Sequence, residues 1–198
     1  MKNLFTTENA AMLLVDHQVG TEKLARNIPH AQLRANVRAL ARTAVETGMP
    51  LVLTSSQEEN FQGRLYESIQ EIAPEAYAAR IKRPGTVDAW LYDDFKAAVE
   101  ATGRNNLVMA GLTNDVCTVF PAISAVEDGY RVQVVLDAGG SPTQQADDIA
   151  AERMRDNGVV ITSTNQLMAE LATDWSSNEG KAIQGVMYEE ILKPLIED

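Results

Sequence analysis

The sequence has one cysteine, two histidines and no long apolar run, and each of these scarcities excludes a class of protein. A single cysteine cannot form an internal disulfide or supply a cysteine-cluster metal site. His17 and His30 do not fit the spacing of any standard metal motif. No apolar run approaches the roughly 18 residues that a membrane-spanning helix needs, and the first residues lack the apolar segment of a signal peptide. We therefore expect a cytoplasmic protein without a metal or other cofactor.

Basic residues are also scarce relative to acidic ones. The chain has 17 Lys and Arg against 28 Asp and Glu, which gives a formal net charge of −11. Such a surface repels nucleic acid and anionic membranes, and no basic stripe or arginine-rich segment reverses this. The acidic residues are expected to form a solvated face, and the expected partner is a small molecule.

Short apolar runs alternate with longer amphipathic segments along the chain. The runs are rich in branched residues and do not alternate cleanly with polar ones, which is typical of strands buried on both faces of a parallel sheet. They span residues 11–15, 50–54, 106–111, 131–136 and 159–161, with a weaker sixth run at 77–81. The predicted helices span residues 32–46, 93–102, 116–128 and 143–156. Because three of these helices end at a glycine that precedes a strand, the pattern predicts a doubly wound, Rossmann-like α/β/α fold with a mostly parallel sheet of about six strands.

The C-terminal segment, residues 178–198, follows after this alternation has ended. Ile183, Val186, Met187, Ile191 and Leu195 recur at helical spacing, which predicts an amphipathic helix. Such a helix either folds back on its own domain or packs on another subunit, and the sequence leaves both arrangements open. The 198 residues contain no linker and no other repeat, so we expect one domain, 1–198, with this segment as its helical tail.

Three chemically useful side chains follow predicted strands, at the sheet edge where ligands of such folds bind. Asp16 follows the first strand, Lys82 follows the weak run 77–81, and Cys117 follows the strand that ends at Gly111. A cysteine in the first turn of a helix lies at the positive end of the helix dipole, and a nearby lysine would further favour the nucleophilic thiolate. An aspartate could take the thiol proton and return it to the leaving group, while backbone N–H groups could stabilise an oxyanion.

Each of these residues also has a plainer interpretation. A lone cysteine is more often a small buried hydrophobe, and a lysine after a strand is usually a solvated surface residue. An aspartate after a strand is often a turn residue or a helix cap, and Asp137, which precedes Gly139 and Gly140, is expected to be one. Spacing alone therefore does not establish a catalytic triad.

Three motifs, in the right order, resemble those of the isochorismatase-like cysteine hydrolases. They are Leu13–Gln18 with its D-x-Q pattern, Arg80–Pro84 around Lys82, and Ala110–Cys117, and the resemblance covers about residues 10–175. The resemblance implies a triad in which Asp16 is the general acid/base, Lys82 orients and polarises, and Cys117 attacks. It also implies a non-proline cis peptide at Leu112–Thr113, with the N–H groups of Thr113 and Cys117 as the oxyanion hole.

The departures from the family pattern narrow the expected function. Nicotinamidases of this superfamily bind a metal after the second strand, whereas residues 54–59 here contain no histidine, so we expect no metal site. The cysteine favours acyl transfer over the vinyl-ether chemistry of true isochorismatases. The run Asp88–Trp90 and the long tail resemble the YcaC-related hydrolases, a subgroup of ring-based octamers, which implies a homo-oligomer. The expected pocket residues are Gln18, Trp90, Asn114 and Phe120, although core packing explains the two aromatic residues equally well.

The sequence thus predicts a metal-independent hydrolase that acts on a small amide-like or related carbonyl substrate through a thioester-type intermediate. Two alternatives remain open. Cys117 could be oxidised rather than acylated, in a redox- or electrophile-responsive protein. The chain could also be an oligomeric binding scaffold with an idle site. A local irregularity is expected at Pro121, which cannot donate a hydrogen bond to the Cys117 carbonyl, so we expect a bend or a short first turn there.

Overall fold

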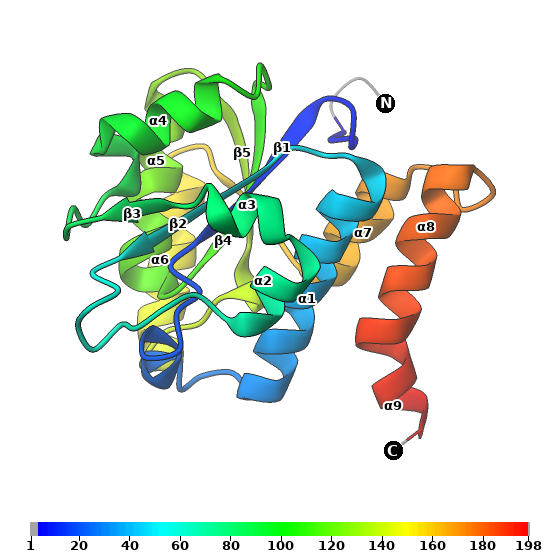
Figure 1. The fold of residues 1–198 in the computed structure, drawn as a ribbon, viewed down its shortest axis with the longest axis horizontal. Helices are drawn as coiled ribbons and strands as arrows, with labels where there is room; N and C mark the ends of the chain where they lie inside the picture. The colour runs from blue at the N-terminus through cyan, green and yellow to red at the C-terminus, as the bar shows by residue number, and fades with distance from the viewer. Residues whose placement is uncertain (1–3, 198) are drawn as a thin grey trace.

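A sheet of six parallel strands forms the centre of the computed structural model, which describes residues 4–197 (Figure 1). The strands are β1 (Ala10–Val15), β2 (Leu51–Ser56), β3 (Ile81–Arg83), β4 (Asn106–Gly111), β5 (Arg131–Val135) and β6 (Val160–Thr162). Their order across the sheet is β3-β2-β1-β4-β5-β6, and every neighbouring pair is parallel. The predicted α/β/α fold with a parallel sheet of about six strands is confirmed.

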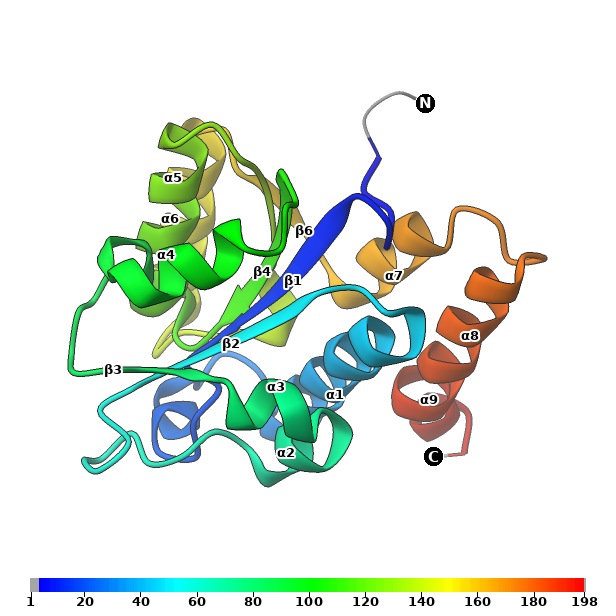
Figure 2. The ribbon, with the colours of Figure 1, turned by 45° about the horizontal axis from the view of Figure 1, so that its top comes forward.

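Helices cover both faces of this sheet (Figures 1 and 2). One face carries α1 (His30–Thr47), α2 (Glu67–Ile72), α3 (Pro74–Ala78), α7 (Thr164–Ala172) and α8 (Asn178–Met187). The other face carries α4 (Asp93–Glu100), α5 (Val119–Glu127) and α6 (Gln144–Asp156). Short 3-10 helices span Thr21–Leu24, Ala89–Leu91 and Leu136–Ala138, π-helical turns span Asn114–Thr118 and Tyr188–Leu192, and α9 is Lys193–Glu197.

The central strand β1 separates two hydrophobic cores. Met12 and Leu14 pack into the core beneath α1 and α7, whereas Leu13 and Val15 pack into the core beneath α4, α5 and α6. Successive side chains of a strand point to opposite faces, so a strand between two cores must be apolar throughout. This explains why β1 reads as a continuous apolar run.

The C-terminal tail folds back onto its own chain, the first of the two arrangements that the sequence left open. Ile183 and Val186 of α8 are buried in the core that α1 helps to form. Ion pairs from Arg38 and Arg42 of α1 to Glu190 fix the next turn of the tail. Residues 1–3 and 198 of the expected domain lie outside the described residues. Within residues 4–197, no helix is both long and apolar enough to cross a membrane.

The region before β3 differs from the prediction. Residues 77–81 were expected to form a strand with Lys82 behind it, but Tyr77 belongs to α3 and the strand is Ile81–Arg83. Lys82 therefore lies inside the strand. Because strand side chains alternate, Lys82 and Arg83 point to opposite sides of the sheet.

The predicted helix 116–128 is also divided in two. The π-helical turn Asn114–Thr118 comes first, and α5 begins only at Val119. Pro121 is therefore in the first turn of α5, where the missing N–H costs little. The short first turn expected at this proline is present as the π-helical turn before α5.

Candidate active site

The structure brings Asp16 and Cys117 together at the carboxyl ends of two neighbouring strands. Asp16 is the first residue after β1, and Cys117 lies in the π-helical turn that follows β4. β1 and β4 are paired so that Val15 lies opposite Gly111, which places both chain ends at one edge of the sheet. Both side chains line a cavity of about 170 Å³. Two of the three predicted triad residues thus share one site.

The turn that carries Cys117 folds tightly against β1, and Gly111 makes this approach possible. A Cβ atom at Gly111 would lie 2.7 Å from Thr118 Oγ1 and 2.8 Å from the Val15 carbonyl oxygen, closer than real side chains come. Glycine is therefore required at this position. The next peptide bond, Leu112–Thr113, is cis, at the position that the family resemblance implied.

Lys82 is not in this site, and its predicted placement beside Asp16 is wrong. The Lys82 side chain is 60% exposed, and its ammonium lies 3.5 Å from Glu58 Oε2. Arg83, one residue later and on the other side of β3, forms a buried ion pair with Asp16 Oδ2. The cause is that β3 runs from Ile81 to Arg83 instead of ending at residue 81, so Lys82 lies inside the strand and Arg83 takes the face toward Asp16.

Arg83 is held by hydrogen bonds at all three of its nitrogens. Nε donates to Thr54 Oγ1 at 3.0 Å, one terminal nitrogen donates to the Thr86 carbonyl, and the other contacts Asp16. Because a guanidinium stays charged at any physiological pH, Arg83 is a permanent counter-ion for the Asp16 carboxylate. Among residues 4–197, no hydrogen-bond donor occupies the other carboxylate oxygen, Asp16 Oδ1.

Burial dominates the electrostatics of the pair Asp16 and Cys117. Burial raises the pKa of the Asp16 carboxyl, and the charge of Arg83 opposes this rise. Burial, together with the negative Asp16 carboxylate beside it, raises the pKa of the Cys117 thiol to about 12. The thiol is therefore protonated at neutral pH, and the expectation that its surroundings favour the thiolate is wrong.

One of the two predicted oxyanion-hole donors lies beside the sulfur. A backbone hydrogen bond from Thr113 to Cys117 lowers the thiol pKa, although burial outweighs it. Thr113 also lines the cavity. Thr113 thus occupies a suitable position for an N–H donor, while the role of the Cys117 N–H stays a prediction.

Of the predicted pocket residues, Gln18 lines the cavity but has its amide in use elsewhere. Gln18 Oε1 accepts a hydrogen bond from the Ser56 N–H at 2.9 Å, and Nε2 donates to the carbonyls of Ser56 and Gly63. Gln18 therefore ties the end of β2 to the loop that follows it, and shapes the cavity wall indirectly.

The other three predicted pocket residues do not line the cavity. The Trp90 indole is buried in the core and donates to Asp128 at 2.7 Å. The Asn114 amide is buried, where it donates to the Leu136 carbonyl and to Asp147. Phe120 packs at the margin of the core beneath α4, α5 and α6. Core packing, the plainer interpretation, holds for both aromatic residues.

The sequence reasoning missed six of the residues that line the cavity. They are Thr21, Leu24, Ser56, Phe61, Gln62 and Val116. Val116 lies next to Cys117, which could have drawn attention to it. The others come from a 3-10 helix, a strand end and a loop. None of them belongs to a periodic sequence pattern from which its position at the cavity could be predicted.

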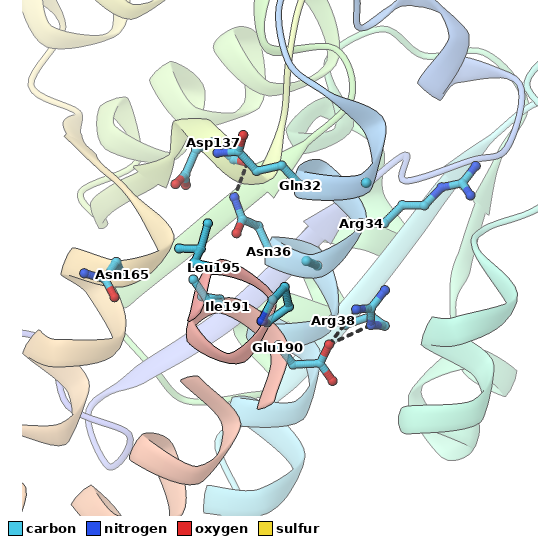
Figure 3. A pocket seen from close by; sticks show the side chains of 12 residues that line it. Gln32, Arg34, Asn36, Arg38, Asp137, Asn165, Glu190, Ile191 and Leu195 are labelled. Carbon is cyan, nitrogen blue, oxygen red and sulfur yellow. Dashed lines mark hydrogen bonds and ion pairs between the residues drawn. The ribbon is translucent and has the colours of Figure 1, made fainter. Parts of the chain in front are cut away.

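A larger cavity lies elsewhere, between α1 and the C-terminal helices (Figure 3). It measures about 580 Å³ and shares no lining residue with the cavity at Cys117. Asn36 Nδ2 donates to the Asp137 carbonyl at 2.7 Å on one side of it, and Arg38 pairs with Glu190 on another. The Asp137 carboxylate accepts hydrogen bonds from the N–H and the hydroxyl of Thr164 in α7, whose N-cap is Ser163, so Asp137 binds the start of a distant helix and is not the cap of its own turn that was expected.

Nothing in the described part of the chain suggests a metal centre. Within residues 4–197, no group of three or more His, Cys, Asp or Glu side chains is arranged to hold a metal ion. Buried His17 donates through Nε2 to the Ala138 carbonyl at 2.7 Å, and burial lowers its pKa to about 4, so its imidazole is neutral. His17 thus joins the ends of β1 and β5.

Comparison with known proteins identifies the family of this chain. The family described as the Isochorismatase domain matches residues 10–166. The chain is 38% identical over 175 residues to the probable hydrolase YcaC of Escherichia coli (strain K12), a match that covers 88% of this chain and 83% of that protein. The structure resembles YcaC from Pseudomonas aeruginosa with hexane-2,5-diol and covalent acrylamide, with a TM-score of 0.92, 35% identity and coverage of 100% of this chain and 97% of that one. It also resembles Escherichia coli YcaC, described as an octameric hydrolase of unknown specificity, with a TM-score of 0.92, 34% identity and coverage of 100% and 96%. The chain therefore belongs to the isochorismatase family of hydrolases.

Proposed function

We propose that the protein is a metal-independent cysteine hydrolase of small amide-like or related carbonyl compounds, with Cys117 as nucleophile. The observation that carries this proposal is the arrangement of Asp16. Arg83 holds one oxygen of the carboxylate, Oδ2, and the other oxygen, Oδ1, has no tightly bound donor among residues 4–197. The same carboxylate interacts with the Cys117 thiol. The thiol, the base and an open cavity coincide at this point.

In the first half of the reaction, the Cys117 sulfur attacks the substrate carbonyl carbon while Asp16 takes the thiol proton. Because the thiol is protonated at rest, this transfer and the attack occur together. The negative charge that develops on the carbonyl oxygen is stabilised by backbone N–H donors, Thr113 among them. The tetrahedral intermediate collapses to a thioester, the carbon–nitrogen bond breaks, and Asp16 gives its proton to the leaving nitrogen.

In the second half, a water molecule hydrolyses the thioester. Asp16, ionised again, takes a proton from the water as its oxygen attacks the thioester carbonyl. The carbon–sulfur bond then breaks, and the proton on Asp16 returns to the Cys117 sulfur. The products are a carboxylic acid and an amine, and the enzyme regains its starting protonation state.

Arg83 is a positioning residue in this scheme. It cannot act as an acid because a guanidinium does not deprotonate in proteins. Its charge keeps the buried Asp16 ionised between steps, against the rise in the Asp16 pKa that burial causes. The raised pKa in turn makes Asp16 a stronger base than an exposed aspartate, which suits a group that must accept a thiol proton.

The similar proteins support a reactive nucleophile and a homo-oligomeric assembly. The Pseudomonas aeruginosa protein is described with covalent acrylamide, a compound that alkylates nucleophiles such as thiols at its alkene carbon, and the Escherichia coli protein is described as octameric. We therefore propose that this chain forms a homo-oligomer, an octamer, which light scattering on the purified protein would test. The expected cytoplasmic location and the single-domain organisation stay predictions.

A redox-responsive role for Cys117 has less support than acyl transfer. Sensor cysteines that react with peroxide are typically accessible and have a low pKa. Cys117 lines an open cavity and is partly exposed, but its pKa is raised to about 12, so few thiolates are available to peroxide at neutral pH.

The test compares the wild type with Cys117→Ala on a panel of small primary and secondary amides and esters. We expect turnover by the wild type, none by the variant, and an acyl adduct on intact wild-type protein that is quenched with acid during turnover. Undiminished turnover by Cys117→Ala would overturn the proposal. A mass increase of one or more oxygens with peroxide, and no acyl adduct with any substrate, would instead favour the redox role.

A further inference from the structure

The cavity at Cys117 has a neutral lining apart from the reacting groups themselves. Its lining residues within 4–197 include only two titratable side chains, Asp16 and Cys117. Arg83 lies behind Asp16, with its three nitrogens already in hydrogen bonds. An anionic group in the cavity would lose its hydration without gaining a counter-ion and would be repelled by Asp16, whereas a cation could pair only with Asp16, the group that has to accept the thiol proton. The lining therefore favours an uncharged substrate.

The volume of the cavity limits the size of that substrate. Its volume of about 170 Å³ is close to the roughly 150 Å³ of an apolar protein cavity that holds one benzene molecule. An amide or ester group takes part of this space, which leaves room for a short aliphatic chain.

Three large apolar side chains from three separate segments surround the mouth of the cavity. Leu24 comes from the 3-10 helix after β1, Phe61 from the loop after β2, and Val116 from the turn that carries Cys117. They are 44%, 60% and 38% exposed, respectively. Exposed apolar residues that gather at one cavity mark a binding surface rather than random exposure.

The loop that carries Phe61 is held in place by its backbone. The Gly20 N–H donates to the Gln62 carbonyl at 2.8 Å, and the Val19 N–H donates to the Arg64 carbonyl at 3.0 Å. A Cβ atom at Gly20 would lie only 1.7 Å from the Phe61 carbonyl oxygen, so glycine is required for this close approach. Phe61 is thus presented on a fixed wall, which is what a selective subsite needs.

From these observations we infer that the site selects small, uncharged carbonyl compounds with a short aliphatic chain, and that Phe61 and Leu24 are specificity-determining residues. This inference rests on the proposed function. The carbonyl carbon lies at the Cys117 sulfur, and the aliphatic chain lies along Leu24, Phe61 and Val116 toward the mouth. Chain length and charge, rather than a specific polar contact, then decide which compounds react.

The test uses alkylation of Cys117 and does not depend on turnover. Acrylamide, N-propylacrylamide and acrylate are compared by intact-mass labelling rates, each divided by its rate with glutathione. Because Cys117 is the sole cysteine, every adduct on a thiol reports this site. Adding the propyl group should raise the normalised rate about 10-fold, the order of discrimination that an apolar subsite provides. The negative charge of acrylate should lower the normalised rate at least as much.

The propyl preference is the normalised rate of N-propylacrylamide divided by that of acrylamide. Phe61→Ala and Leu24→Ala should each lower this ratio most of the way to one, and Val87→Ala should leave it unchanged. Val87 is a matched control because it is also exposed and apolar but does not line the cavity. Equal normalised rates for the three probes would overturn the inference, as would an unchanged preference in Phe61→Ala. If Phe61→Ala loses the preference and also changes the oligomeric state, then Phe61 serves contacts between subunits rather than substrate binding. That result would also overturn the inference. Selective labelling without turnover of any amide or ester would sustain this inference and contradict the proposed function.

Discussion

Two carboxylate–guanidinium pairs lie beside β3, and burial gives them opposite properties. In the pair Asp16–Arg83 both side chains are only 1% exposed, and burial raises the pKa of Asp16 despite the cation. In the pair Glu58–Arg80 the side chains are 5% and 11% exposed, and hydrogen bonds from Arg80, which outweigh burial, lower the pKa of Glu58 to about 2. The same chemical pairing thus yields a base in one place and a lasting anion in the other.

Lys82 and Arg83, adjacent on one strand, each contact the carboxylate of a different pair. Lys82 contacts Glu58 and is largely exposed, whereas Arg83 contacts Asp16 and is buried. The comparison teaches that the face of β3, and not the presence of a cation near residue 82, decides which residue pairs with the Asp16 carboxylate. Five variants test this difference.

Asp16→Asn should have the largest effect. Loss of the base should lower kcat/KM by about 100- to 10,000-fold, since proton transfer by a positioned group contributes that much. Glu58→Gln is the matched control from the other pair, and its kcat/KM should stay within about threefold of the wild type because Glu58 does not line the catalytic cavity. Steady-state kinetics on one amide substrate measures both, and equal losses in the two variants would remove the distinction between the pairs.

Arg83→Leu should destabilise the fold as well as lower activity. It leaves the Asp16 carboxylate buried without its counter-ion, which typically costs about 3–5 kcal/mol in the free energy of unfolding. Arg80→Leu should cost less, about 1–3 kcal/mol, because Glu58 keeps the hydrogen bond from Ser55 and the ion pair with Lys82. Urea denaturation measures both values, and a smaller loss for Arg83→Leu than for Arg80→Leu would contradict the account.

The pH dependence of stability should carry opposite signs for the two carboxyl groups. The Glu58 pKa is lowered to about 2, so its contribution is present above its ordinary pKa and is lost as the pH falls toward 2. The Asp16 pKa is raised, so its contribution is present at low pH and is lost as the pH rises through the native pKa. As the pH is lowered through the acidic range, the urea midpoint should therefore decrease less steeply in Glu58→Gln than in the wild type. An equally steep fall in that variant would show that Glu58 has no part in it.

Lys82→Ala should have the smallest effect. The side chain is mostly exposed, and its contact with Glu58 is one of the weak surface pairs, so stability should change by less than about 0.5 kcal/mol. The kcat/KM should stay within about twofold of the wild type. A loss of tenfold or more would return Lys82 to the reaction and weaken the role proposed for Arg83.

The sequence predicted the fold well because its signals are local and strong. The apolar run before Asp16 and the run that ends at Gly111 each need burial on both faces, and they became β1 and β4. Since neighbouring parallel strands end at the same edge, the meeting of Asp16 and Cys117 followed from the topology.

The cation and the cavity wall could not be predicted in the same way. β3 has only three residues, and a shift of one residue in so short a strand exchanges Lys82 with Arg83. Leu24 and Phe61 reach the cavity from a 3-10 helix and a loop, whose course depends on long-range contacts such as that of Gly20 with the Phe61 carbonyl. The pKa of Cys117 is likewise raised by burial in the folded chain. The position of the residue near the start of a helix predicted the opposite, a lowered pKa.

The pH dependence of Cys117 alkylation by iodoacetamide, in the wild type and in Asp16→Asn, tests the central claim most directly. In the proposed mechanism the thiol is protonated at rest, because burial and the Asp16 charge raise its pKa, and it is activated only by proton transfer to Asp16. It therefore predicts an apparent thiol pKa near 12 in the wild type and a clearly lower value in Asp16→Asn, which keeps the cation Arg83 but loses the anion. A wild-type thiol pKa at or below the ordinary value of about 8.5, or no change in Asp16→Asn, would contradict it.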